Sequence, residues 1–179
     1  MKNIILLSLI FLGASPPESI FAGIVEEVLI VPSFGGASIG GLMVGVEIKQ
    51  VLKKYSVSEC GYYTSEIGLF GATPKARNLA IYAVFSKELF DNNNFSGHLG
   101  IGLGYIRGVK RGDLIEEQLL GDSFERIDFQ TVCLPLEFTI CKHFRYFGYG
   151  AKMSVNLNYR QPFVGVLFCA PVGKFVFVE

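Results

Sequence analysis

The sequence predicts an all-β fold, a closed antiparallel up-and-down transmembrane β-barrel of about eight strands. The main observation is residues 146–159, YFGYGAKMSVNLNY, where apolar side chains from Phe147 to Tyr159 alternate with Gly, Lys, Ser and Asn. A period of two is the pattern of a strand with two unlike faces. This segment exceeds the about 5–6 residues of a usual strand and reaches the about 9–11 that cross a bilayer. We therefore expect its apolar face toward lipid and its polar face toward the barrel interior.

Composition agrees with a lipid-facing barrel. The chain is 50% hydrophobic and 18% charged, with 21 Gly, 16 Phe and 8 Tyr. No stretch after the N-terminal segment offers the roughly 18 apolar residues that a membrane-spanning helix needs. Apolar residues at every second position of many strands account for both observations. Lys+Arg and Asp+Glu are both 16, so no excess of positive charge points to nucleic acid as a partner.

The N-terminal segment, residues 1–22, is predicted to be a secretory signal peptide. Lys2 provides the positive start, residues 4–12 form a short apolar run, and small residues follow at 13–15. A second candidate cleavage site ends at Ala22, so the cut is expected between residues 15 and 22. A buried N-terminal helix is the alternative. Residues 23–179 then form the barrel domain.

Four strands are expected in the first half of the chain, at residues 28–34, 42–48, 57–70 and 79–89. The glycines of residues 34–41, FGGASIGG, mark a turn, as do Pro74 and the run Asp91–Asn94. In the third strand the alternation blurs at residues 61–63, which suggests a β-bulge.

The second half adds four more strands, at residues 95–108, 129–140, 146–159 and 164–178. HLGIGLGYIRG, residues 98–108, places a row of glycines on one face, which leaves room for bulky neighbours in a narrow barrel. Its GIGLG is not the GxGxxG of a dinucleotide-binding turn. The charged residues 110–126 are expected to be a solvated loop, in part helical or an extended hairpin. An even strand count lets the first strand pair with the last.

Four cysteines, Cys60, Cys133, Cys141 and Cys169, allow three complete pairings, and the sequence does not choose among them. Cys133 and Cys141 are expected on one strand, which excludes their mutual pairing if it is straight. Free, buried thiols are favoured over disulfides. No spacing of Cys and His indicates a zinc site.

Several segments together carry a resemblance to a known family. They are VGVEIKQVL (44–52), HLGIGLGYIRG (98–108), LPLEFT (134–139) and RQPFVG (160–165), behind the expected signal peptide. The chain resembles the small outer-membrane β-barrel proteins of Gram-negative bacteria, especially the Bacteroidetes-type outer-membrane β-barrel domain. The resemblance implies export to the outer membrane, contact with outer-membrane lipid, insertion by the barrel-insertion machinery and a monomeric state.

The polar residues on the inner face of these strands form the candidate site. They are Glu47, Lys49, His98, Glu137, Lys152, Asn156 and Asn158. Buried charges persist when they are paired and hydrogen-bonded. An eight-stranded barrel is only wide enough to be filled by its own side chains, so this set is expected to plug the interior.

Catalytic chemistry is not expected. His98 and Glu137 both face inward and could approach each other across neighbouring strands, whereas His143 lies near a turn and is expected in solvent. No serine is placed as a nucleophile for either histidine, so no enzyme, cofactor or metal is predicted.

The leading interpretation is a non-enzymatic outer-membrane barrel with a structural or surface-interaction role. One alternative is a secreted, soluble, lipocalin-like barrel that binds a hydrophobic ligand, and a third is a lipid-modifying barrel enzyme. The first two differ in which face of the strands is apolar.

Overall fold

The computed structural model describes residues 27–67, 73–92, 94–116 and 122–173. The expected signal peptide and the chain end from residue 174 lie outside these residues. The described part contains eight strands, in the order β1 (Glu27–Ala37), β2 (Gly41–Leu52), β3 (Tyr55–Glu66), β4 (Arg77–Asn92), β5 (Phe95–Glu116), β6 (Ser123–His143), β7 (Gly148–Leu157) and β8 (Phe163–Cys169).

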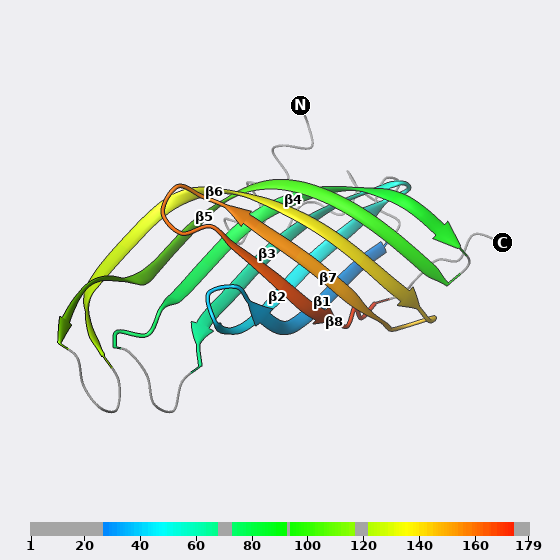
Figure 1. The fold of residues 1–179 in the computed structure, drawn as a ribbon. Coiled ribbons are helices and arrows are strands. Elements are labelled where there is room, and N and C mark those ends of the chain that lie inside the picture. Colours follow the sequence, from blue (N-terminus) through cyan, green and yellow to red (C-terminus); the bar gives the residue numbers. More distant parts are fainter. Residues whose placement is uncertain (1–26, 68–72, 93, 117–121, 174–179) are drawn as a thin grey trace.

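The eight strands form a closed barrel in which each strand pairs antiparallel with its neighbours in sequence (Figure 1). The ring closes between β1 and β8, whose register runs from Ser33 opposite Cys169 to Ala37 opposite Gly165. Closure leaves no unpaired sheet edge along these contacts. The predicted fold class and the pairing of the first strand with the last are confirmed.

The outer face of the barrel is apolar. Residues directly opposite each other in antiparallel strands share a face, and one such row crosses five strands. It consists of Phe85, Ile101, Leu136, Val155 and Val164. Large apolar side chains remain exposed along the row, among them Phe85 at 51% and Ile101 at 52%. A soluble barrel would turn such a face inward, so the structure favours the membrane interpretation over the lipocalin-like one. Among the described residues, no helix has the length and apolarity needed to cross a membrane.

The two ends of the barrel differ. The ends of β2, β4, β6 and β8 and the starts of β1, β3, β5 and β7 gather at one end, here called the turn end. The other end, here called the hairpin end, carries the long β5–β6 hairpin (Figure 1).

The hairpin corrects the expectation of a solvated loop over residues 110–126. β5 has 22 residues and β6 has 21, and their ladder continues through Lys110 opposite Ile127 and Arg111 opposite Arg126. The extended-hairpin alternative is therefore right. Polar side chains indicate solvent but do not prevent strand pairing, because backbone hydrogen bonds form the ladder whatever the side chains are.

The predicted bulge in the third strand is wrong. The pairing of β3 with β2 and β4 has no register shift around residues 61–63. The alternation looked blurred because Tyr62 points inward and Tyr63 outward, so an aromatic stands on each face. A true irregularity falls between Glu88 and Phe90 on β4.

Candidate functional site

Three charged residues of the predicted set meet in the middle of the barrel. Glu47 on β2, Glu137 on β6 and Lys152 on β7 all point inward, and they are 4%, 5% and 2% exposed. Lys152 Nζ contacts Glu47 Oε2 and lies 3.2 Å from Glu137 Oε2. One ammonium group therefore forms ion pairs with two carboxylates, one on β2 and one on β6.

Hydroxyl groups complete this arrangement. Ser58 Oγ donates to Glu47 Oε1 at 2.5 Å, Tyr82 OH donates to Glu137 Oε1 at 3.3 Å, and Lys152 Nζ donates to Tyr62 OH at 3.1 Å. The rings of Tyr62 and Tyr82 stack with centroids 5.4 Å apart. We call these residues the central cluster: Glu47, Ser58, Tyr62, Tyr82, Glu137 and Lys152. Buried charges are tolerated when their remaining hydrogen-bonding capacity is met, as it is here.

Glycines make room for the two tyrosines. A Cβ at Gly104 would lie 2.1 Å from the Cβ of Tyr82, and a Cβ at Gly45 would lie 2.3 Å from Cδ1 of Tyr62. These distances are far inside van der Waals contact, so only glycine fits beside these rings. The predicted role of the glycine row on β5 is confirmed, and Gly45 extends it to β2.

Glu47, Cys60 and Glu137 bring one donor atom each to within 4.8 Å of one another, which is close enough to hold a metal ion. Lys152 Nζ already contacts both carboxylates. The positive charge that these carboxylates require is thus supplied by the chain itself, and the cluster is built as an ion-pair network.

A second polar cluster occupies the turn end of the interior. Ser96 Oγ is hydrogen-bonded to Nε2 of His98 at 3.1 Å and also to Nε2 of His143. The possible approach of His98 to Glu137 does not occur, because the register sets Thr139 opposite His98 and Gly100 opposite Glu137.

The prediction that His143 lies in solvent is wrong, because this residue is half-buried. β6 extends to His143, which carries the side chain into contact with Ser96. The sequence did carry a signal for the contact between Ser96 and His98, because two residues that are two positions apart on a strand share a face. A serine nucleophile needs access for its substrate and an oxyanion site. Ser96 is 3% exposed, which suits a structural hydrogen bond better.

The remaining predicted residues divide between the interior and a turn. Lys49 is half-buried on the inner face of β2, and Asn156 is fully buried. Asn158 instead closes the β7–β8 turn, where its Oδ1 accepts from the backbone N–H groups of Gln161 at 2.7 Å and Arg160 at 3.0 Å. An Asn side chain commonly caps its own turn in this way, and its Nδ2 also donates to Asn156 Oδ1 at 2.9 Å, so Asn158 joins the turn to the interior set.

All four cysteines are buried, and Cys133 and Cys141 share β6 as predicted. Cys141 Sγ and Cys169 Sγ lie 3.6 Å apart. They come from strands on either side of β7, where Gly150 stands opposite both residues. The missing side chain of Gly150 lets the two sulfurs approach each other, which no spacing in the sequence indicates.

Comparison with known proteins gives the fold. No protein-family model and no curated protein matches this chain. The solved structure of Neisserial surface protein A is 12% identical with a TM-score of 0.59, over 83% of this chain and 95% of that one. The N-terminal β-barrel domain of Pseudomonas aeruginosa OprF is 10% identical with a TM-score of 0.53, over 84% of this chain and 98% of that one. The chain therefore shares the barrel fold of these two proteins over most of its length.

Proposed function

We propose that the protein is a small, monomeric, integral outer-membrane β-barrel without enzymatic activity, which serves a structural or surface-interaction role. It is exported, inserted by the barrel-insertion machinery and surrounded by outer-membrane lipid. The observation that carries this proposal is the inversion of the two faces, with an apolar exterior row and a charged, hydrogen-bonded interior. Membrane barrels have this inversion because lipid replaces water outside the wall.

The interior is closed to ordinary solutes in this proposal. The central cluster links β7 to β2, β3 and β6 through Lys152, so it reaches across the lumen rather than along one wall. Eight strands leave an interior that side chains can fill. The stacked rings of Tyr62 and Tyr82 supply the bulk for this.

Conductance measurements test the closed interior. The purified barrel in a planar lipid bilayer is expected to give no regular single-channel steps in salt solution, because the central cluster blocks the lumen. A general porin in the same bilayer is the positive control. Large, steady steps from the barrel alone would contradict the proposal and would require a wider barrel or an oligomeric pore.

Surface interaction is assigned to the hairpin end. Beyond Gln130, the outward residues of β6 are Asp128 and Arg126 rather than apolar residues. Outer-membrane barrels direct their short turns to the periplasm and their longer connections to the outside. The β5–β6 hairpin is thus proposed to extend from the cell surface, where loops and hairpins carry function.

Shortening this hairpin separates the surface role from folding. Val109 and Asp128 are opposite each other, so replacing residues 110–127 by Asn-Gly gives a two-residue turn suited to a hairpin. We expect this variant to fold into lipid vesicles as the wild type does, because the removed part lies beyond the apolar band. Any surface-binding phenotype of the cells should disappear. A shortened barrel that retains the phenotype would place the interaction elsewhere.

A further inference from the structure

The outer face changes from apolar to basic toward the hairpin end, in steps that the strand register defines. Four successive rows of opposite residues can be followed on β3–β6. The first row is Ile81, Tyr105 and Val132, and the second is Tyr63, Leu79, Arg107 and Gln130. The third row is Ser65, Arg77, Val109 and Asp128, and the fourth is Arg111 and Arg126. The first row is apolar apart from the hydroxyl of Tyr105. The arginines therefore begin one row beyond the lipid-facing surface.

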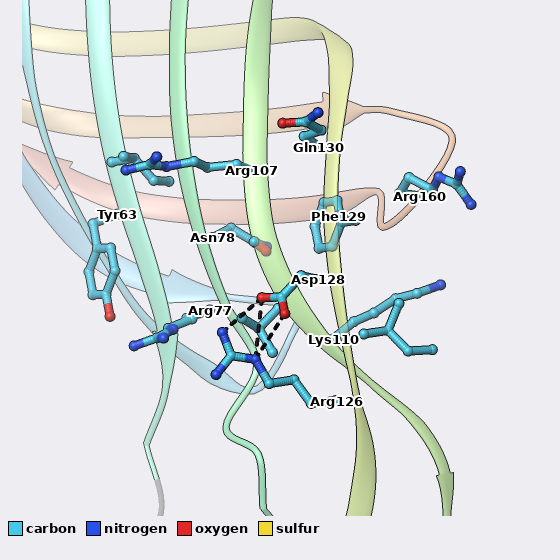
Figure 2. A pocket seen from close by; sticks show the side chains of 14 residues that line it. Tyr63, Arg77, Asn78, Arg107, Lys110, Arg126, Asp128, Phe129, Gln130 and Arg160 are labelled. Atoms are coloured by element: carbon cyan, nitrogen blue, oxygen red, sulfur yellow. Dashed lines mark hydrogen bonds and ion pairs between the residues drawn. The ribbon is translucent and has the colours of Figure 1, made fainter.

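A hollow of about 900 Å³ lies among these arginines (Figure 2). Its charged lining residues are Arg77, Arg107, Lys110, Arg126, Arg160 and Asp128. Lys110 shares the inner face with Gly108, and Arg160 lies on the β7–β8 turn. The outward charges are therefore Arg77, Arg107, Arg126 and Asp128, with a formal net charge of +2, whereas the whole chain has a net charge of zero. Positive charge is thus concentrated at this site.

Among the arginines of the hollow, Arg126 forms an ion pair with the single carboxylate, Asp128, whereas Arg77 adds only a longer-range attraction to it. Arg126 binds Asp128 at two points, with Nη2 2.9 Å from Oδ1 and Nε 3.1 Å from Oδ2 (Figure 2). Arg77 and Arg107 are exposed, and neither forms an ion pair with any residue in the described part of the chain. Two guanidinium groups are therefore available for an external anion.

We propose that this hollow binds the phosphorylated headgroup of a lipid in the adjoining outer leaflet. Guanidinium groups bind phosphate oxygens in a two-point, charge-assisted geometry. The row below Arg107 faces acyl chains, and Tyr63 and Tyr105 lie at the level that interfacial aromatics occupy. A phosphate held by Arg77 and Arg107 is thus at headgroup depth, directly above the acyl chains of the same lipid.

The proposal rests on the proposed membrane placement, and it adds a specific lipid chemistry to it. A free anion would gain only the charge contacts, whereas a lipid also covers Leu79 and Tyr63 beside Arg107. For this reason we assign the site to a phosphorylated lipid.

The test compares two double variants that each remove two positive charges from the outer face. Arg77→Gln with Arg107→Gln alters the hollow, and this variant, called the hollow variant, keeps the ion pair between Arg126 and Asp128. The matched control is Lys87→Gln with Lys142→Gln, on the outward face of β4 and β6 at the turn end. Each protein is reconstituted in phosphatidylcholine nanodiscs that contain lipid A with both phosphates, and retained lipid A is measured by native mass spectrometry.

We expect lipid A retention to fall at least about tenfold in the hollow variant, since the loss of even one charge-assisted hydrogen bond corresponds to roughly that factor. The control should match the wild type. Lipid A without phosphates should be retained by the wild type as weakly as phosphorylated lipid A is by the hollow variant.

Other results would overturn the assignment. If the wild type retained lipid A with and without phosphates equally, the phosphate groups would not be what the hollow recognises. Displacement of lipid A by inorganic phosphate at similar concentration would indicate a free-anion site, and tighter binding of a sulfated glycan would indicate a surface glycan as the partner. If the wild type failed to fold into phosphatidylcholine membranes at all, the membrane placement itself would fail, which is distinguishable from a loss confined to the hollow variant.

Discussion

Replacing Lys152 by Met is expected to lower the free energy of unfolding of the barrel by about 3–5 kcal/mol. Lys152 Nζ is the ammonium group that contacts both Glu47 and Glu137, and all three side chains are at most 5% exposed. Met keeps much of the side-chain volume but carries no charge. Two carboxylates would then face each other in the interior without the ammonium between them, and the donor to Tyr62 OH would also be lost.

The control for this variant removes the charges together. In Lys152→Met combined with Glu47→Gln and Glu137→Gln, no buried charge is left without its partner, so most of the lost stability should return. Lys142→Met, on the outward face of β6, should change little. Urea unfolding of the barrel in lipid vesicles gives the free energies by linear extrapolation. If Lys152→Met unfolded at the same urea concentration as the wild type, the ion pairs would not stabilise the interior.

Placing Arg at Val155 is expected to destabilise the membrane-inserted barrel by about 2–4 kcal/mol. Val155 lies in the apolar row between Leu136 and Val164, so a guanidinium there meets acyl chains and not water. The same vesicle unfolding measurement reports this cost. Because Val155 points away from the interior, the central cluster is unaffected and the loss reports on lipid contact alone.

Tyr159→Arg is the matched control, on the same side of the chain but beyond the end of β7. Tyr159 is 88% exposed and follows the last residue of the strand, so Arg there can reach water or headgroups. It should cost at most about 1 kcal/mol, as expected near the interface. If the two arginines had the same effect, the assigned face or depth of Val155 would be wrong.

The sequence by itself determined the strands and the direction of their faces. Alternation is a local property, because successive side chains of a strand point to opposite sides whatever the strand pairs with. This is why β7 was predicted with Met153 and Val155 outward and Lys152 and Asn156 inward, as the structure has them. The same reasoning placed Glu47 and Glu137 inside, and the glycine row of β5 next to bulky side chains.

Only the tertiary structure decided which of these residues meet. Lys152 and Glu47 are 105 positions apart, and their contact depends on how β7 and β2 face each other across the closed ring. The contact of Ser96 with His143, the length of the β5–β6 ladder and the rows that gather Arg77 and Arg107 depend equally on the register of neighbouring strands. Register is set by the pairing of whole strands and by closure of the barrel. A pattern along one strand specifies the face of a side chain but leaves its partner on another strand open.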